Sequence, residues 1–411
     1  MKNLFKYFIV AVLAVGFSSC DQFEQVADSQ KVVNISAKVV VKTTLPEGVP
    51  APESYKVKFN NYTEGYEFDV ATDANGVVTT ESIIPGIYSI TVSAEVAHNG
   101  AVYNFNGNLV NVNILDNNQS LTVDVNPSKS GALVIKEIFY CGSKTPSGGS
   151  YFRDQFYEIY NNSDMVQYVD GMCIGNMLPA LASENLPVWP EEFASTHVFF
   201  ATIWQLPGTP GENNYPVQPG ESIIIAQMAD NHQREALNPG SPVNLIGAEF
   251  EAYLQSTSLI KDNPAINMNL AFWPSPSKQW LVTVFGGAYA IFFPEEAIDR
   301  NTYITPIGQT TKAKEIPIDW VVDAVELVND ETKIKLKRVP AVLDAGATTV
   351  GATYCNKSVA RKVKEMIANP DGTTRPKYFD TNNSSEDFYV TEIPMIHRDG
   401  AKSPSWNTWK N

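Results

Sequence analysis

The stretch 130–163 constrains the fold of this chain more than any other part of it. It reads as two β-strands separated by a loop rich in glycine and serine. Leu133, Ile135 and Ile138 give the first strand an apolar face, and the residues of 156–161 follow the two-residue period of a second strand. Two such strands in succession favour a β-hairpin. We therefore expect the chain to be built around β-sheets.

The length of 411 residues favours two or three domains. Hydrophobic residues make up 44 % of the chain, which is enough to form a core, whereas charged residues make up only 18 %. Sparse charge with frequent Tyr, Phe, Asn, Pro and Gly is typical of an exported β-protein with many turns. The 45 acidic and 30 basic residues leave a net charge of −15, which repels a phosphate backbone, so we expect no nucleic-acid partner.

The N-terminus has the features of an export signal. Lys2 and Lys6 make it positively charged, and 7–15 is an apolar run too short to span a bilayer stably. We therefore interpret 1–19 as a signal peptide that is removed from the mature chain.

Small residues stand directly before Cys20 in an arrangement that resembles a bacterial lipobox, with Phe17 where leucine is usual. The resemblance implies cleavage before Cys20 and acylation of its sulfur and new amino group, which anchors the mature chain to a membrane. The polar segment 20–31 is then a tether. Asp21 and Glu24 resemble a surface-export signal, so we expect an outer-membrane lipoprotein that faces either the periplasm or the cell surface. The alternative is an ordinary signal peptide followed by a chance cysteine.

Residues 32–127 predict a small β-domain of about seven strands. The run 33–41 alternates between two faces, as a half-buried strand does. The turn at 72–77 and the strand entry at 84–92 resemble those of the prealbumin-like or carboxypeptidase-regulatory-like β-sandwich, which implies two packed sheets. The polar segment 127–131 is the predicted linker to the next domain.

Residues 128–411 resemble the lamin-tail-like immunoglobulin sandwich. The matching pieces follow the order of that module and lie at 137–138, 156–161, 169–172, 217–226, 358–361 and 380–388. Their spacing is longer than in the compact module, which implies long irregular insertions at 176–212 and 229–276. Long connections of this kind are often functional. The expected fold class is therefore all-β, with two tandem immunoglobulin-like β-sandwich domains.

The whole mature chain resembles a Bacteroidota lipoprotein family of unknown function. Such lipoproteins often accompany TonB-dependent outer-membrane receptors and help to capture nutrients. The resemblance therefore implies an outer-membrane protein as one partner, but it brings no established activity with it.

Three later segments carry local predictions. Residues 279–285 and 288–293 read as strands joined by a hairpin turn at 286–287. The pattern of 320–328 fits either a strand or a helix, and 333–337 reads as a further strand.

Few residues point to catalysis. The four histidines form no HExxH motif and no other pair at i,i+4, and the sequence contains no GxSxG, GxGxxG or P-loop motif. Adjacent acids such as Glu191 and Glu192 read as solvated turns or helix starts. We therefore expect no enzyme, no cofactor and no metal site, although a pair of catalytic acids contributed by separated segments stays open at this point.

Three cysteines, Cys141, Cys173 and Cys355, remain in addition to Cys20. They have neither CxxC spacing nor neighbouring histidines, so no zinc site is predicted. The interpretation we favour is that they are small buried hydrophobic residues. An exported chain can also form one disulfide, which would leave one thiol free.

Polar residues within the sandwich motifs are expected to be structural. We predict that Glu158 holds the opening loop and that Arg361 pairs with an acid. Asp387 lies in a sandwich motif as well, and Asn161 and Asp170 read as turn and strand-end residues.

The tryptophans are the main candidates for recognition. Trp189, Trp204 and Trp273 lie in the proline-rich insertions, where an exposed ring can stack on a sugar or dock a protein. Trp280 and Trp320 lie in strand-like segments and are predicted to be core residues.

These observations favour a membrane-anchored, non-enzymatic binding or assembly module, with an outer-membrane protein or a glycan as its partner. The alternative is a surface lipoprotein that binds or degrades carbohydrate, with the aromatic residues and scattered acids of the insertions forming a cleft.

Overall fold

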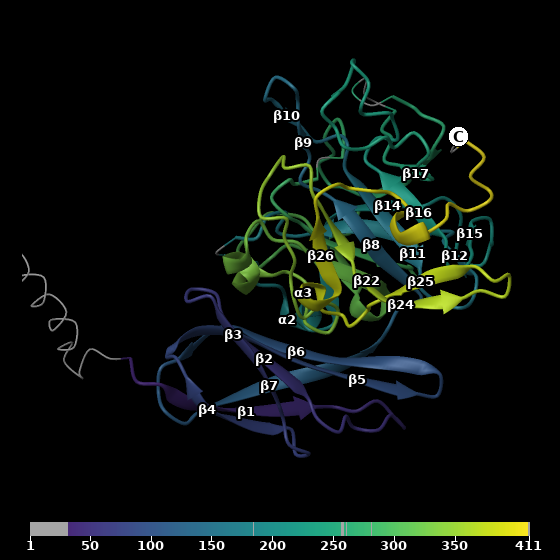
Figure 1. The fold of residues 1–411 in the computed structure, drawn as a ribbon. Helices are drawn as coiled ribbons and strands as arrows, with labels where there is room; N and C mark the ends of the chain where they lie inside the picture. The colour runs from purple at the N-terminus through teal and green to yellow at the C-terminus, as the bar shows by residue number, and fades with distance from the viewer. Residues whose placement is uncertain (1–31, 184, 256–258, 260, 281, 410–411) are drawn as a thin grey trace, which may run out of the picture.

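The computed structural model describes residues 32–183, 185–255, 259, 261–280 and 282–409. These residues form two β-sandwich domains, and the second lies over one face of the first (Figure 1). The predicted all-β fold class is confirmed, because the α-helices are single turns, α2 (Glu191–Ala194) and α3 (Ser384–Asp387). Among the described residues, no helix has the length and apolar character needed to cross a membrane.

The described part of the first domain contains seven strands, in the order β3-β2-β5-β6-β7-β1-β4. They are β1 (Ile35–Thr43), β2 (Lys56–Asn61), β3 (Tyr66–Ala71), β4 (Val77–Ile83), β5 (Gly86–His98), β6 (Ala101–Ile114) and β7 (Gln119–Lys129). Strand β7 joins the two layers of the sandwich. Its residues 119–125 pair in parallel with β1 in one layer, and its residues 126–129 pair antiparallel with β6 in the other. Between the layers lies a core that includes Val39, Phe59 and Ile90, all fully buried.

The predicted turn before β4 has a purely local explanation. One carboxylate oxygen of Asp73 accepts hydrogen bonds from the backbone N–H groups of Asn75 and Val77, both at 2.9 Å. Gly76 has a φ of 72°, a conformation that glycine adopts without strain. A Cβ on Gly76 would also lie 3.3 Å from the carbonyl oxygen of Val41. The sequence of this turn thus leads the chain tightly from β3 into β4 and brings Gly76 against Val41 of β1, whose backbone N–H donates to the Gly76 carbonyl oxygen at 2.8 Å.

The junction between the domains is more ordered than the predicted linker. Strand β7 continues through Lys129, and Pro127 pairs with Phe105 of β6. Strand β6 also faces the second domain with three asparagines at alternate positions. Their side-chain amides donate to second-domain carbonyl oxygens in the pairs Asn104–Asp380 (2.9 Å), Asn106–Thr381 (2.7 Å) and Asn108–Ala345 (3.0 Å).

Two larger sheets form the second domain. One has the order β18-β17-β16-β11-β8-β23-β26 and comprises β8 (Leu133–Phe139), β11 (Phe156–Asn161), β16 (Ser222–Ala226), β17 (Phe250–Glu251), β18 (Ile266–Asn267), β23 (Ser358–Arg361) and β26 (Phe388–Thr391). The other has the order β19-β14-β13-β20-β22 and comprises β13 (Cys173–Met177), β14 (His197–Gln205), β19 (Asn269–Phe272), β20 (Ala288–Phe292) and β22 (Val321–Glu326), with β21 (Lys314–Pro317) paired to β14. Short pairs complete the domain: β9 (Ser143–Lys144) with β10 (Ser150–Tyr151), β12 (Gln167–Tyr168) with β15 (Pro216–Val217), and β24 (Val363–Ala368) with β25 (Thr374–Tyr378).

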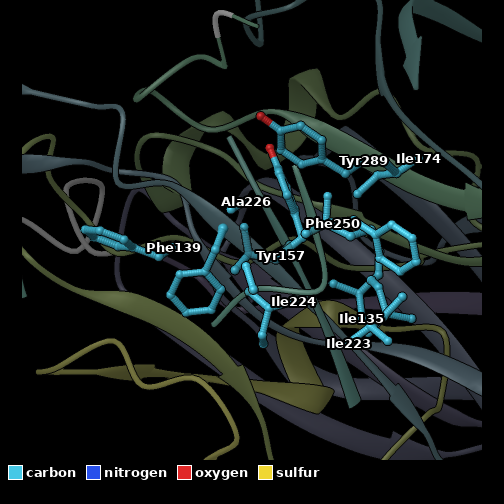
Figure 2. Close-up of a cluster of buried hydrophobic side chains, with 14 of the residues drawn as sticks. Ile135, Phe139, Tyr157, Ile174, Ile223, Ile224, Ala226, Phe250 and Tyr289 are labelled. Atoms are coloured by element: carbon cyan, nitrogen blue, oxygen red, sulfur yellow. The ribbon is translucent and has the colours of Figure 1, made fainter. Parts of the chain in front are cut away.

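The predicted hairpin of 130–163 is the centre of the first of these sheets. Strands β8 and β11 pair antiparallel, with a register shift between Glu158 and Ile159, and every residue of both strands is buried. Side chains from this hairpin meet those of the second sheet in one core (Figure 2). There the ring of Tyr157 lies 5.0 Å from Tyr289 and 5.5 Å from Trp280.

The two predicted insertions contribute strands as well as loops. Segment 176–212 contains β14, which lies inside the second sheet, and 229–276 contains β17, β18 and β19. These segments therefore add strands to the two sheets and do not only form surface loops.

Two of the local strand predictions are wrong and one is decided. Residues 279–285 form no strand in their described part, and β20 pairs with β13 and β22 instead. Residues 333–336 lie in the 3-10 helix η3 (Glu331–Leu336), and Lys337 is the extended residue that follows it. The ambiguous segment 320–328 ends the 3-10 helix η2 (Ile318–Trp320) and then forms strand β22, so the strand alternative holds.

Candidate functional site

Two loops of the second domain carry exposed apolar side chains. The backbone N–H of Ile307 donates to the carbonyl oxygen of Val188 at 2.8 Å and joins loop 178–190 to loop 293–313. Val188 is 64 % exposed and Ile307 is 63 % exposed. We define the 188/307 surface as the exposed apolar residues of these loops, which are Leu181, Leu186, Val188, Tyr303 and Ile307. Several such side chains on two joined loops mark a candidate contact surface.

The guanidinium of Arg338 fixes the start of the first loop. It donates to the carbonyl oxygens of Pro179 at 3.1 Å and Ala180 at 3.0 Å. The carboxylate of Glu326, on strand β22, pairs with the same guanidinium at 2.7 Å, and both side chains are buried. A planar guanidinium with several donors suits this task, because it can hold a carboxylate and two carbonyls at once. The loop is therefore attached directly to the core of the domain.

The second loop is closed by its own contacts. Ile304 and Ala313 exchange two backbone hydrogen bonds, each of 2.9 Å. The ammonium of Lys312 lies 4.1 Å from the centre of the Tyr303 ring, within the range of a cation–π interaction. Both loops are thus held in place before any partner arrives, which lowers the entropy lost on binding.

Two of the three candidate tryptophans lie partly at the surface. The ring of Trp189 stacks on Phe199 of β14, with centroids 3.9 Å apart and planes 14° from parallel. One face of the indole is therefore covered by Phe199. Trp273 is half-buried and packs against the main core of the second domain.

Trp204 is a correction to the sequence-based expectation. Its side chain is fully buried on β14, and its ring lies 6.0 Å from that of Trp280. A partner at the surface cannot reach it, because the supposed insertion supplies a strand whose inward side chains fill the core. Trp280 is buried as predicted, whereas Trp320 is only partly buried.

A groove of about 920 Å³ lies between the two domains. It combines charged, polar and apolar side chains from distant segments, among them Lys129, His197, Asp319, Leu343 and Asn382. The imidazole Nδ1 of His197 lies 2.8 Å from the Thr196 hydroxyl, and the Asn382 amide donates to Ser128 at 2.6 Å. The volume is within the range of ligand sites in proteins.

The acids of the sandwich motifs are buried and engaged, as predicted. Arg361 is held by three carboxylates, at 2.6 Å from Asp323, 3.2 Å from Asp387 and 3.4 Å from Asp380. Burial raises the pKa of Asp323 to about 7 and that of Asp380 to about 6, against the opposing effect of Arg361. The side chains of these carboxylates are at most 5 % exposed and all three bind Arg361, which gives them a structural role, although Asp323 also belongs to the lining of the groove.

Glu158 has a structural role, but not the predicted one of holding the loop between β8 and β11, because its hydrogen bonds go to Lys136 and Ser222 on the neighbouring strands. Its carboxylate, fully buried, accepts from the Lys136 ammonium at 2.8 Å and from the Ser222 hydroxyl at 2.6 Å. It thereby connects strands β8, β11 and β16. Asp170 behaves similarly at a strand end, where its carboxylate accepts the backbone N–H groups of Asn214 and Tyr215.

The predicted lipidation site, Cys20, lies outside the described residues, as do the signal peptide and the tether. Within the described part of the chain, no group of three or more His, Cys, Asp or Glu side chains is placed to hold a metal ion.

Sequence reasoning missed the role of loop 293–313 and the groove between the domains. Both depend on which segments the fold brings together, and the local pattern around Ile307 gives no sign of Val188. One available signal was the alternation of Asn104, Asn106 and Asn108, because a strand with amides on one side predicts a face that docks onto backbone carbonyls.

Comparison with known proteins places the chain in a family. A family model described as a protein of unknown function, DUF4876, matches residues 218–395. The crystal structure of a DUF4876 family protein from Bacteroides thetaiotaomicron is 39 % identical in sequence with a TM-score of 0.63, and the match covers 91 % of this chain and 99 % of that one. A crystal structure described as "a putative adhesin" from Bacteroides ovatus matches at 14 % identity and a TM-score of 0.16, over 37 % of this chain and 56 % of that one. No curated protein matches. The identity and coverage of the Bacteroides thetaiotaomicron structure show that this chain belongs to the DUF4876 family of proteins of unknown function.

Proposed function

We propose that this chain is a lipid-anchored, non-enzymatic binding or assembly module of the cell envelope, and that it docks an outer-membrane protein through the 188/307 surface. The observation that carries the proposal is the exposure of Val188 and Ile307 on loops that Arg338 and backbone hydrogen bonds already hold in place. Apolar side chains on a preorganised support are the usual source of binding energy at protein interfaces.

The surface chemistry favours a protein partner over a glycan. Stacking on sugar rings needs open aromatic faces, but Trp204 is buried and one face of Trp189 is covered by Phe199. The aliphatic side chains of Val188 and Ile307 offer no hydrogen bonds to sugar hydroxyls. They match an apolar patch on another protein.

The groove between the domains supports a second candidate, binding of a polar small ligand such as an oligosaccharide. His197, Asp319 and Asn382 provide both donors and acceptors along its wall. In this candidate the groove binds the ligand and the 188/307 surface has no role in recognition.

The cellular setting belongs to the proposal as well. The charged and apolar segments before Cys20 support export and lipidation. The two β-sandwich domains support the prealbumin-like and lamin-tail-like resemblances, which are finer assignments within the same all-β class. A TonB-dependent transporter is the partner of this kind that the family resemblance favours.

Replacing Cys20 with alanine is expected to release the protein from membranes. The acyl chains provide the anchor, so their loss removes the main hydrophobic contact with the bilayer. Fractionation of cells that produce the wild-type chain and the Cys20→Ala variant checks this, with both fractions probed for the protein. A variant that stays with the membrane fraction to the wild-type extent would show that the lipobox interpretation is wrong.

Placing a charge on the 188/307 surface is expected to disrupt the complex with the outer-membrane partner. Val188→Asp and Ile307→Asp each put a carboxylate into an apolar contact, and we expect at least about 30-fold weaker binding, the effect of losing a hot-spot residue. The measurement is photo-cross-linking in cells from a benzophenone side chain at position 186, with the cross-linked transporter identified by mass spectrometry. Leu115→Asp is the matched control, because Leu115 is 60 % exposed but lies in the first domain.

The outcomes separate the two candidates. Loss of the cross-link in the Val188 and Ile307 variants, with the Leu115 variant unchanged, supports protein docking. Equal cross-linking in all variants contradicts it. Oligosaccharide binding that survives both aspartate substitutions but is lost in His197→Ala would favour the groove instead.

A further inference from the structure

Two of the three cysteines in the described residues lie side by side although they are 214 positions apart in sequence. The sulfur of Cys355 is 3.4 Å from the sulfur of Cys141. Cys141 is fully buried two residues after the end of strand β8, and Cys355 is half-buried in the loop that leads to strand β23. Cys173 is buried in a different apolar cluster, so it is not a competing partner.

The backbone on both sides holds the two thiols together. The N–H of Tyr354 donates to the carbonyl oxygen of Cys141 at 2.7 Å, and the N–H of Asn356 donates to that of Gly142 at 3.4 Å. The residues on either side of Cys355 are thus attached to Cys141 and to its neighbour. Separation of the two backbone segments would require these hydrogen bonds to break.

Three residues around the pair adopt the left-handed backbone conformation. The φ angles are 51° for Tyr354, 61° for Asn356 and 68° for Gly142. This conformation is uncommon for tyrosine, and it persists only where the surroundings determine it. A Cβ at Gly142 would also lie only 2.5 Å from the carbonyl oxygen of Tyr151, so glycine is required there. The unusual backbone serves to bring Cys355 to Cys141.

We propose that Cys141 and Cys355 form a disulfide when the chain meets an oxidant that carries a reactive disulfide, such as an envelope thiol oxidase or oxidised glutathione. The sulfurs need to approach by about 1.4 Å to reach bonding distance. The proposal does not depend on the identity of the binding partner.

The half-buried Cys355 is the thiol that an oxidant reaches first. The hydrogen bond with Cys141 lowers the pKa of Cys355 to about 6, so this sulfur is the better nucleophile near neutral pH. Its thiolate attacks one sulfur of the oxidant disulfide and releases the other as a thiolate. Cys141 then gives up its proton to that leaving thiolate or to water and attacks Cys355, and the second oxidant sulfur leaves. Two cysteine thiols are oxidised to one disulfide, and one oxidant disulfide is reduced to two thiols.

The bond would reinforce a weak seam of the seven-stranded sheet. Strands β8 and β23 pair at only two positions, Val359 with Ile138 and Ala360 with Glu137. A link from the end of β8 to the approach of β23 would fasten the C-terminal strands to the central hairpin. It would also close a very long loop, which restricts the unfolded chain strongly.

Thiol counting on the full chain tests the proposal. Protein recovered from cell envelopes under acid quench is denatured and treated with a maleimide polymer, with and without prior reduction. We expect one addition without reductant, at Cys173, and three with it, because Cys20 is acylated. Mass spectrometry of the unreduced digest should find the peptides of Cys141 and Cys355 joined. Three additions without reductant, or a disulfide that includes Cys173, would overturn the proposal.

A second measurement uses protein produced in a reducing compartment, in which the cysteines start as free thiols, and compares the wild type with cysteine variants. Reduced protein incubated with oxidised glutathione should gain at least about 5 °C in its unfolding midpoint, and reductant should reverse the gain. The Cys141→Ser/Cys355→Ser double variant should show neither the gain nor its reversal. The Cys173→Ser variant should show the same gain in unfolding midpoint as the wild type, and reductant should reverse it. A gain that persists in the double variant, or no gain in the wild type, would contradict the assignment.

Discussion

Replacing Arg361 with methionine is expected to lower the free energy of unfolding by about 3–5 kcal/mol, the range found when one partner of a buried ion pair is removed. Arg361 is 2 % exposed and faces Asp323, Asp380 and Asp387. It also donates to the carbonyl oxygen of Ile135 at 3.0 Å. Without the guanidinium, the three buried carboxylates lose their counter-charge and must repel one another or bind protons, and either outcome costs free energy at neutral pH. Urea unfolding followed by tryptophan fluorescence measures the change.

The matched control for Arg361→Met is Lys364→Met, three residues further along the chain. Lys364 pairs with Glu95 of the first domain at 3.5 Å, but both side chains are about 40 % exposed. Exposed ion pairs contribute at most about 1 kcal/mol, so this variant should unfold almost as the wild type does. Equal effects of the two substitutions would mean that the cluster around Arg361 is solvated, contrary to its burial.

Replacing Lys136 with methionine is expected to destabilise the chain by a similar amount, about 3–5 kcal/mol. Lys136 is fully buried in β8, and its ammonium donates to Glu158 and to the carbonyl oxygen of Arg398, both at 2.8 Å. Methionine fills the same space but leaves the Glu158 carboxylate without its cation. The loss should therefore come from charge and not from packing.

A double-mutant cycle separates these two contributions. In Lys136→Met/Glu158→Leu both charges are absent, and apolar side chains of similar size replace a buried ion pair with little loss or even a gain. We expect the double variant to recover most of the stability that Lys136→Met loses, measured by the same urea titration. The cycle also includes the single variant Glu158→Leu. If the stability losses of Lys136→Met and Glu158→Leu simply added in the double variant, lost packing around Lys136 would be the cause instead.

Regular strands and local turns were the parts of the fold that the sequence could predict. The two-residue period of β1, β8 and β11 and the turn at Asp73 depend on neighbours within a few positions, so their patterns are readable in order. The pairing of Arg361 with an acid and the structural role of Glu158 were also predicted. Their motif context, rather than their chemistry alone, identified them.

The wrong strand prediction at 279–285 has a specific physical reason. Trp280, Val282 and Val284 are buried, so the apolar pattern is real. The backbone is satisfied by side chains instead of by a neighbouring strand: the amide of Gln227 donates to the carbonyl of Trp280, and the amide of Gln155 donates to that of Val282 at 3.4 Å. The side chains of two buried glutamines thus take the place of the backbone hydrogen bonds that a neighbouring strand would provide. No local pattern reveals such partners.

The candidate site was predictable only in its general location. The proline-rich composition of 176–212 marked this region, and Trp189 and Val188 lie there. The sequence analysis grouped Trp204 with Trp189, but Trp204 belongs to the apolar run 197–205 that forms strand β14, whereas Trp189 stands between Val188 and Pro190 in a loop. Ile307 was not predicted to be part of the site, because its partner Val188 lies far away in the sequence. Several strands separate the two residues along the chain, and only the fold brings them together.

The parallel pairing of β1 with β7 has a mechanical consequence. The chain enters β1 at Ile35 and leaves β7 at Lys129, which lie at opposite ends of the pair because the two strands run in the same direction. If the N-terminus is fixed and the second domain is dragged away, the tension acts along the strands. All the hydrogen bonds between Ala37–Thr43 and 119–125 then bear the load together in shear, instead of opening one after another as in a zipper. The parallel pairing therefore makes the first domain resistant to tension applied between its two ends.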